Sequence, residues 1–236
     1  MRNTLHIEFY GIPGCGKTTI ANLVSRKLES QGYILVIPDK RLKYDRNPFY
    51  RKIMKLFTTI KYSLTHPVTL LKIICLTKKN GYKKINNQIT HIVNIIPKIY
   101  IYNSTPANKI VVWDEGITQS SVSLSVNSLV SVKENENAII DLIDKNIIQI
   151  HVYLVVEMKI ALERMDKRAT NDSRVEKEHN KEKQLAFLQK FEDVCNSYDK
   201  DIVINVGDKS VEEIANEVLS KLIEKIKMVE NNISLC

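Results

Sequence analysis

The chain has 236 residues, with 35 lysines and arginines against 27 acidic residues and a formal net charge of +8. Hydrophobic residues make up 44% and charged residues 26% of it, which is typical of a folded globular protein and excludes wholesale disorder. The sequence shows no apolar run near the roughly 20 residues of a membrane span and no C-x-x-C pair, and its first residues lack the apolar pattern of a signal peptide, so secretion is not expected. We therefore expect one domain, without a disulfide framework or zinc site, in a reducing cytoplasm.

Five apolar, mostly β-branched stretches predict buried strands, at residues 5–10, 33–38, 110–113, 147–156 and 202–206. Amphipathic patterns predict helices at residues 18–30, 158–168, 176–198 and 211–228. Strands that alternate with helices indicate an α/β fold, a parallel sheet covered on both faces. We expect the end of the chain, residues 230–236, to form a loose tail.

Positive charge is concentrated between the second and third predicted strands. Residues 40–98 contain fourteen lysines and arginines and one acid, Asp45, a charge of about +13 against about −5 for the rest. Prolines and an Asn-Gly pair divide the stretch into two or three helices, which we expect as an insertion at residues 44–103. Such a block favours an anionic partner, namely a nucleotide, a glycan, nucleic acid or a membrane surface. The alternative is that the lysines are simply solvated.

The strongest motif runs from Gly11 to Thr19. Its residues, Gly11-Ile12-Pro13-Gly14-Cys15-Gly16-Lys17-Thr18-Thr19, match the phosphate-binding pattern G-x-x-x-x-G-K-[ST] without a mismatch. Glycines allow successive N–H groups to point into one anion-binding nest, and the following helix adds its positive end. Lys17 is then placed for the β- and γ-phosphates, and the Thr18 hydroxyl for Mg²⁺. The motif follows a predicted strand and opens a predicted helix, so it predicts a nucleoside triphosphate site.

Two acids, Asp114 and Glu115, follow the third predicted strand. Ligands bind at such strand ends in open α/β sheets, so Asp114 is a candidate to hold the metal through water. Glu115 is a candidate base for an acceptor hydroxyl. The alternative is that the pair caps the next helix. Because the chain lacks the Asn-Lys-x-Asp sequence of GTPases, a small-molecule kinase is favoured.

Three arginines surround a polar break between two predicted helices: Arg164, Arg168 and Arg174. Phosphoryl transfer spreads negative charge over three equatorial oxygens, so positioned arginines lower its barrier. We interpret residues 164–176 as a lid that carries these catalytic arginines. The alternative is a solvated charged loop, in which each ion pair contributes little.

A further candidate site follows the second predicted strand. Asp39 is a possible base for an acceptor hydroxyl, and Lys40 and Arg41 are candidates to bind an acceptor phosphate. The same residues, after Pro38, also fit a simple turn. The five histidines show no metal-ligand spacing, and the single tryptophan, Trp113, is expected in the core.

The chain resembles the thymidylate kinase-like branch of the P-loop nucleoside monophosphate kinases over most of its length, except residues 44–103. The family's phosphate loop is similar to residues 11–19, and its Asp-Arg and Ser-Ser pairs to Asp114-Glu115 and Ser120-Ser121. Its Ala-Leu-x-Arg helix, its lid and its closing helix resemble residues 161–164, 172–176 and 211–214. The resemblance implies a five-stranded parallel sheet of order 2-3-1-4-5, ATP and Mg²⁺ as donor, and a monophosphate or hydroxyl acceptor beside the second strand.

The departures from the family concern the acceptor. Tyr10 stands where the family commonly has an acid, Glu115 replaces an arginine, and the lid has one extra residue, Ser173. The basic insertion replaces the family's acceptor region, so thymidylate itself is not favoured.

Three functions stay open. The first is an ATP-dependent kinase of a nucleoside, a nucleotide or another small acceptor. The second is a kinase of the same fold whose acceptor is a lipid-linked or polymeric glycan or a polypeptide, with the basic segment 40–98 on an anionic polymer or the inner membrane face. The third is a nucleotide-dependent regulatory protein without transfer activity. A homodimer is compatible with each.

Overall fold

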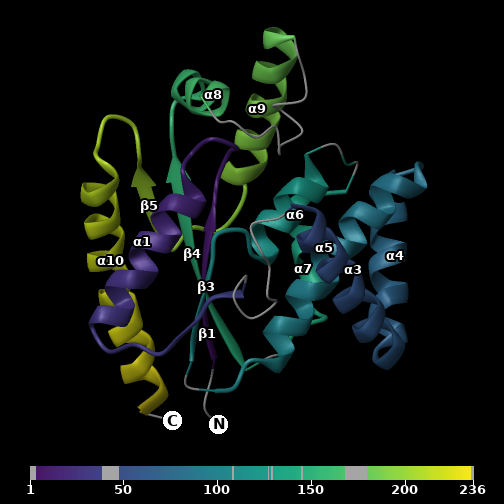
Figure 1. The fold of residues 1–236 in the computed structure, drawn as a ribbon, viewed down its shortest axis with the longest axis horizontal. Helices are drawn as coiled ribbons and strands as arrows, with labels where there is room; N and C mark the ends of the chain where they lie inside the picture. Colours follow the sequence, from purple (N-terminus) through teal and green to yellow (C-terminus); the bar gives the residue numbers. More distant parts are fainter. Residues whose placement is uncertain are drawn as a thin grey trace.

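A five-stranded parallel sheet forms the centre of the molecule in this computed structural model (Figure 1). The structure describes residues 4–38, 48–107, 109–126, 128, 130–144, 146–167 and 180–234, without the side chains of 48, 49 and 230–234. The strands are β1 (Thr4–Tyr10), β2 (Leu35–Val36), β3 (Ile110–Trp113), β4 (Ile147–Val155) and β5 (Ile202–Asn205). Their spatial order is β2-β3-β1-β4-β5, and every pairing is parallel, which confirms the predicted topology.

Helices cover both faces of the sheet. The helices α1 (Lys17–Ser30) and α10 (Val211–Ser234) lie on one face, and α5 (Ile85–Ser104), α6 (Ile117–Ser125) and α7 (Val132–Ile140) lie on the other (Figure 1). The helices α8 (Met158–Asp166) and α9 (Lys181–Asn196) lie at the end of the sheet where the strands finish. All seven residues of β1 are buried, the apolar ones and also three polar ones, Thr4, His6 and Glu8.

Two of these polar residues, His6 and Glu8, form buried polar contacts on the α5 side of the sheet. His6 Nδ1 accepts a hydrogen bond of 3.0 Å from the Trp113 indole, and Tyr102 stacks on the same imidazole at 4.0 Å between ring centroids. Burial lowers the pKa of His6 to about 3, so the ring is neutral. Trp113 is only 4% exposed and belongs to the core, as expected.

The insertion between β2 and β3 contains three helices: α3 (Pro48–Thr65), α4 (Pro67–Lys79) and α5. Pro67 starts α4, a position where a missing N–H costs nothing. Pro97, which was expected to separate helices, instead lies inside α5. A proline there removes one backbone hydrogen bond, but Ile95, Ile96 and Ile99 around it are fully buried, and this packing favours a continuous helix.

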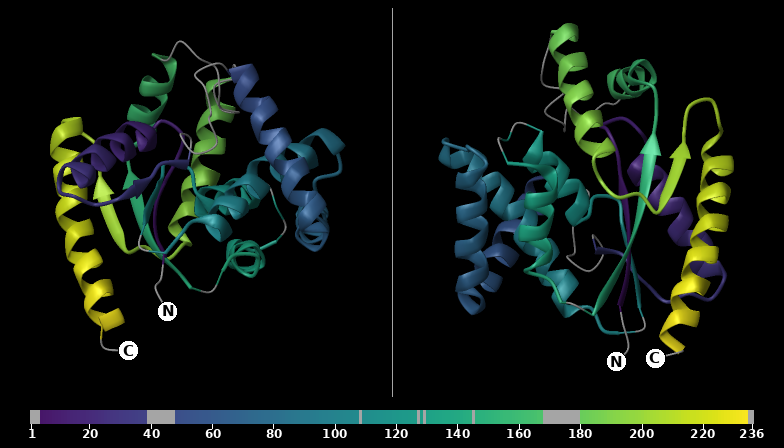
Figure 2. Two further views of the ribbon diagram at one scale, coloured as in Figure 1. Left: turned by 60° about the horizontal axis from the view of Figure 1, so that its bottom comes forward. Right: turned by 180° about the vertical axis from the view of Figure 1, so that it is seen from behind.

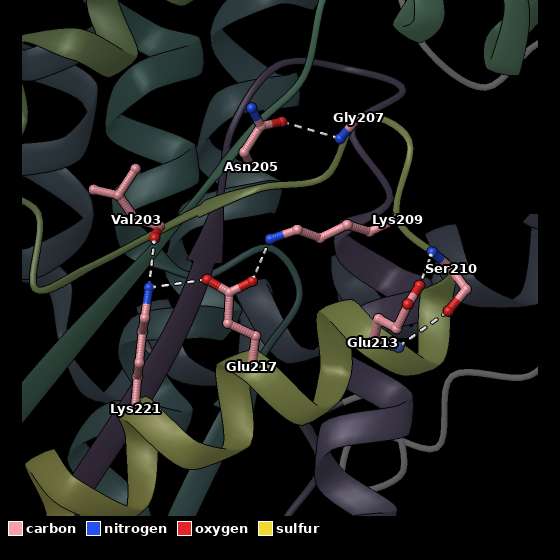
Figure 3. Close-up of polar contacts among 8 residues, drawn as sticks. All are labelled: Val203, Asn205, Gly207, Lys209, Ser210, Glu213, Glu217 and Lys221. Carbon is pink, nitrogen blue, oxygen red and sulfur yellow. Dashed lines mark hydrogen bonds and ion pairs between the residues drawn. The ribbon is translucent and has the colours of Figure 1, made fainter.

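The last helix begins at a capping box. The Ser210 hydroxyl accepts from the backbone N–H of Glu213, and the Glu213 carboxylate accepts from the backbone N–H of Ser210 (Figure 3). Lys209 and Lys221 both contact Glu217 on the next turns. The helix continues to Ser234, so the loose tail expected at 230–236 is wrong up to that residue.

Other boundaries also differ from the prediction. Only Leu35–Val36 of the expected strand 33–38 pairs with β3. The helices α6 and α7 were not predicted. For α6 the reason is that it is buried on nearly all sides and so lacks an amphipathic pattern. Residues 168–176 of the expected lid at 164–176 lie outside the described residues. Among the helices that the structure describes, none combines the length and apolarity needed to cross a membrane.

The pairing of β4 with β5 places His151 beside Asp201. The His151 backbone N–H donates to the Asp201 carboxylate at 2.9 Å, and the imidazole Nδ1 lies 3.4 Å from it. Burial lowers the pKa of His151, but the hydrogen bond to Asp201 and the charges of Glu8, Asp201 and Glu136 outweigh this and raise it above its ordinary value. The same hydrogen bond holds the pKa of Asp201 at about 2.

This pair predicts a pH-dependent stability. Because the pKa of His151 is raised on folding, its contribution is present below about pH 6.5 and is lost as the pH rises through the folded-state value. We expect Asp201→Asn to lower the free energy of unfolding by about 1 kcal/mol at pH 5.5 and by less at pH 8.5. Urea unfolding at both pH values measures this, and an equal loss at both would contradict it.

Candidate functional site

The loop between β1 and α1 is tightly curled by three glycines. Gly11, Gly14 and Gly16 have φ angles of 148°, 86° and 94°, a region that favours glycine. A Cβ at Gly11 would lie 2.6 Å from the Leu154 carbonyl oxygen, and one at Gly14 would lie 2.5 Å from that of Ala161. Two of the three glycines are therefore needed for close packing against β4 and α8 as well as for the turn.

Lys17 closes this loop from the first turn of α1. Its ammonium group donates to the carbonyl oxygens of Gly11 and Ile12 at 3.0 and 3.1 Å, and the residue is only 8% exposed. The helix begins after Gly16 without a side-chain cap, so its first N–H groups and its positive end face the loop. A cation and a helix N-terminus aimed at one concave loop make an anion-binding site.

The end of β3 adds oxygen ligands to the same place. The Thr18 hydroxyl donates to the Asp114 carboxylate at 2.8 Å, which joins the phosphate loop to the adjacent strand. A hydroxyl and a carboxylate are ligands that suit Mg²⁺, so the donor set fits this ion. Glu115, the next residue, is exposed to the cavity described below.

Glu8 of β1 fixes the turn that carries Asp114 and Glu115 through hydrogen bonds. One Glu8 carboxylate oxygen accepts from the backbone N–H of Thr118 at 2.8 Å, and the other accepts from Gln149 at 3.0 Å and from the Tyr102 hydroxyl. Gly116 passes so close to this carboxylate that a Cβ there would overlap it. Burial and the Glu8 charge raise the pKa of Tyr102 well above its ordinary value, so Tyr102 stays a hydrogen-bond donor.

A cavity of about 530 Å³ opens from the phosphate loop toward the insertion. Lys17 and Thr18 line its loop end, Glu115 and Gln119 line its β3 side, and Phe187 of α9 adds an aromatic wall. The far wall is one face of α5, formed by residues three and four positions apart: Asn87, Thr90, His91, Asn94, Ile95 and Lys98. The cavity therefore joins the anion-binding loop to a polar helix face.

Two lysines of the insertion contribute to this wall. Lys98 donates to the Gly116 carbonyl oxygen at 3.0 Å and to the Ser120 hydroxyl at 2.6 Å, which places a cation beside the acidic turn. Lys55 of α3 donates to the Asn94 side chain at 3.1 Å. With Lys17, they give the cavity three cations against Glu115 among its lining residues, an environment that favours an anionic occupant.

Among the described residues that line this cavity, Arg164 does not occur. Its guanidinium donates to the carbonyl oxygens of Val206 and Gly207 at 3.1 and 3.2 Å, in the loop after β5. Arg164 thus joins α8 to that loop, and a role in transfer stays a prediction. The structure does not describe five of the predicted site residues, which are Asp39, Lys40, Arg41, Arg168 and Arg174. Their expected roles stay predictions.

Sequence reasoning missed the polar face of α5 and also Gln119, whose side chain accepts from the Gly11 backbone N–H at 3.1 Å. A signal for α5 was present, because polar residues recur at 87, 90, 91, 94 and 98, a spacing of three and four that places them on one side of the helix. For Gln119 the only signal is its place one turn after Gly116. Its contact with the phosphate loop depends on packing between distant segments.

No family model matches the chain, and no curated protein sequence is similar to it. Three solved structures that match it are a deoxyadenosine kinase from M. mycoides, a gluconokinase from Sinorhizobium meliloti and a shikimate kinase from Acinetobacter baumannii. The first is 21% identical, over 93% of this chain and 99% of that one, with a TM-score of 0.44. The second is 13% identical, over 98% and 99%, with a TM-score of 0.49, and the third 12%, over 95% of both, at 0.44. At this level the similarity concerns the arrangement of the chain alone.

Proposed function

We propose that this protein is an ATP-dependent phosphotransferase of the nucleoside monophosphate kinase type, which transfers the γ-phosphate of ATP to a small anionic or hydroxyl acceptor. One observation carries the proposal. The phosphate loop, with Lys17 across it, opens directly into a cavity of about 530 Å³ that also holds Glu115 and a polar helix face. Phosphoryl transfer requires that the donor and the acceptor bind side by side in one site, and this cavity joins both parts.

On the donor side, the glycine-rich loop Gly11–Thr19 would bind the triphosphate through its backbone N–H groups. Lys17 now donates to loop carbonyls, and bound phosphate oxygens would offer it stronger, charged acceptors. Thr18 and Asp114 would hold Mg²⁺, which neutralises phosphate charge when it is bound.

On the acceptor side, the acceptor hydroxyl oxygen would attack the γ-phosphorus while the bond from phosphorus to the β–γ bridging oxygen breaks and ADP leaves. Glu115 lies at the cavity and is the candidate to take the hydroxyl proton. Lys98 and Lys55 would attract an anionic acceptor, and the amide and hydroxyl groups of α5 would orient it. Asp39 is the alternative base, and Arg168 and Arg174 are proposed to stabilise the transferring group.

The finer assignment, to the thymidylate kinase-like branch, is supported by sequence motifs alone. Residues 11–19, 161–164 and 211–214 resemble its phosphate loop, its arginine helix and its closing helix. The acidic Glu115 and the basic insertion differ from that branch, so we propose an acceptor other than thymidylate.

The decisive experiment is ADP release from ATP and Mg²⁺ with a panel of nucleosides, monophosphates, sugars and glycans. We expect one acceptor class to stimulate release. We also expect Glu115→Gln to lower kcat by about 100-fold or more without changing ATP affinity, because it removes the base and leaves the loop intact. Intact ATP binding without stimulation by any acceptor would contradict the proposal, and an unchanged kcat in Glu115→Gln would assign the base to Asp39.

A further inference from the structure

The helix α3 turns an apolar face away from the body of the protein. Thr59 and Tyr62 are buried on its inner side, where α3 packs on α5. Its outer side exposes six large apolar residues, each between 43% and 79% accessible: Tyr50, Ile53, Leu56, Phe57, Ile60 and Leu64. Their spacing of three and four places them on one face. A helix of a globular domain normally turns such a stripe toward the core, so this face needs a partner outside it.

The neighbouring helix α4 has the same character. Its Ile73 and Leu76 are buried, whereas Val68 and Leu71 are 63% and 61% exposed. Both helices lie at the edge of the molecule farthest from α10, as the views in Figures 1 and 2 agree. We call the exposed apolar residues of α3 and α4 the outer face.

The charges on these two helices have one sign. No acidic residue occurs anywhere between Asp45 and Asp114. The exposed charged residues of α3 and α4 are Arg51, Lys52, Lys61, Lys72, Lys78 and Lys79. Lys79 forms an ion pair with Glu134 of α7, at the margin of the helices. The outer face therefore combines large apolar side chains with a positive surround.

We propose that the outer face docks on an anionic lipid bilayer surface. An amphipathic helix that lies in the membrane interface inserts its apolar residues among the acyl chains, and its lysines contact the headgroups. Each lysine or arginine near an anionic membrane adds attraction that falls off within a Debye length. The complementary partner thus has a negatively charged surface above an apolar interior. A bilayer with anionic headgroups has both properties.

Charge argues against a second copy of the chain as the partner. Two outer faces brought together would oppose lysines and arginines with no acid from α3 or α4 between them, and like charges across an interface are unfavourable. A bilayer with anionic headgroups removes this repulsion.

Docking would also orient the catalytic cavity. The same helix α3 contributes Lys55 to the cavity wall from its inner side, so the cavity lies directly behind the membrane-bound helix. The docking proposal itself does not depend on phosphate transfer.

The test is co-sedimentation of the full chain with vesicles of phosphatidylcholine alone and with 30% phosphatidylglycerol. We expect binding to the anionic vesicles that is at least about tenfold stronger than to the neutral ones and that weakens from 0.1 to 0.5 M salt. We expect Leu64→Glu to lower this binding about tenfold, and Ile60→Glu with Leu64→Glu to abolish it.

The matched control is Ile34→Glu, which makes the same charge change at a side chain that is 66% exposed on another part of the surface. It should bind as the wild type does, and thermal unfolding should show that all variants are folded. Lys17→Ala should also bind normally, which separates this proposal from the kinase activity.

Three results would overturn the proposal: no preference for anionic vesicles, an equal loss in Ile34→Glu, or a dimer in sedimentation velocity that Leu64→Glu converts to a monomer. The last would identify the outer face as an interface between copies.

Discussion

Lys17→Ala should lower kcat for ATP-dependent transfer by at least about 100-fold, the scale observed when one preorganised donor to a developing charge is removed. Lys17 is the cation held over the phosphate loop, where its ammonium donates to the carbonyl oxygens of Gly11 and Ile12. Alanine leaves these carbonyls without that donor and the loop without its positive charge. Steady-state ADP release, with whichever acceptor the panel described above selects, measures the effect.

The matched control is Lys27→Ala, at the other end of α1. Lys27 forms an ion pair with Glu212 of α10 and has no contact with the phosphate loop. An exposed pair of this kind contributes little to stability, so we expect an unchanged kcat and a nearly unchanged Tm. If Lys17→Ala kept its activity within tenfold of the wild type, our interpretation of the loop would be wrong.

Gly14→Ala should disable the same loop through its backbone. Gly14 has a φ of 86°, where an alanine costs about 1–2 kcal/mol. Its Cβ would also lie 2.5 Å from the Ala161 carbonyl oxygen, which is backbone of α8 and moves only with that helix. The loop must therefore open or α8 must shift, and either change disturbs the N–H groups that we propose to bind phosphate. We expect ATP affinity to fall at least about tenfold, a loss of about 1.4 kcal/mol.

Gly32→Ala shows the effect of an unfavourable φ angle alone, without the steric collision that Gly14→Ala also causes. Gly32 has a similar φ of 90°, but nothing lies within 4 Å of its added Cβ, and it follows α1 at the end away from the loop. We expect it to lower Tm by about 2–8 °C, the result of 1–2 kcal/mol in a chain of this size, and to leave ATP affinity unchanged. Calorimetric titration and thermal unfolding compare the two variants, and equal ATP affinities would refute the role given to Gly14.

The phosphate loop and the sheet could be predicted because each depends on local pattern. The motif Gly11–Thr19 is contiguous, and its glycines meet a backbone requirement that the sequence itself displays. Apolar residues gather in short runs at the strands, and four of the five were located to within one residue at each end. The strand β2 was less well located, because only two of the six residues expected there pair with β3.

The rest of the site could not be read in this way because its residues meet only across the fold. Glu8 appears in the sequence as an unexplained acid in a strand, and only the structure brings it to Thr118 and Gln149. Gln119 reaches Gly11 across more than a hundred residues. The outer face of α3 has an ordinary amphipathic spacing, and only burial shows that its apolar side points outward.

The sequence by itself determined the phosphate loop, the alternation of strands and helices, and the concentration of positive charge between β2 and β3. These properties arise from neighbours along the chain, where spacing and residue type are enough. The tertiary structure alone decided that α5 forms the far wall of the cavity, that Arg164 contacts the loop after β5, and that the apolar side of α3 faces away from the core. The reason is physical: which side of a helix is buried depends on what packs against it, and that partner comes from a distant part of the chain.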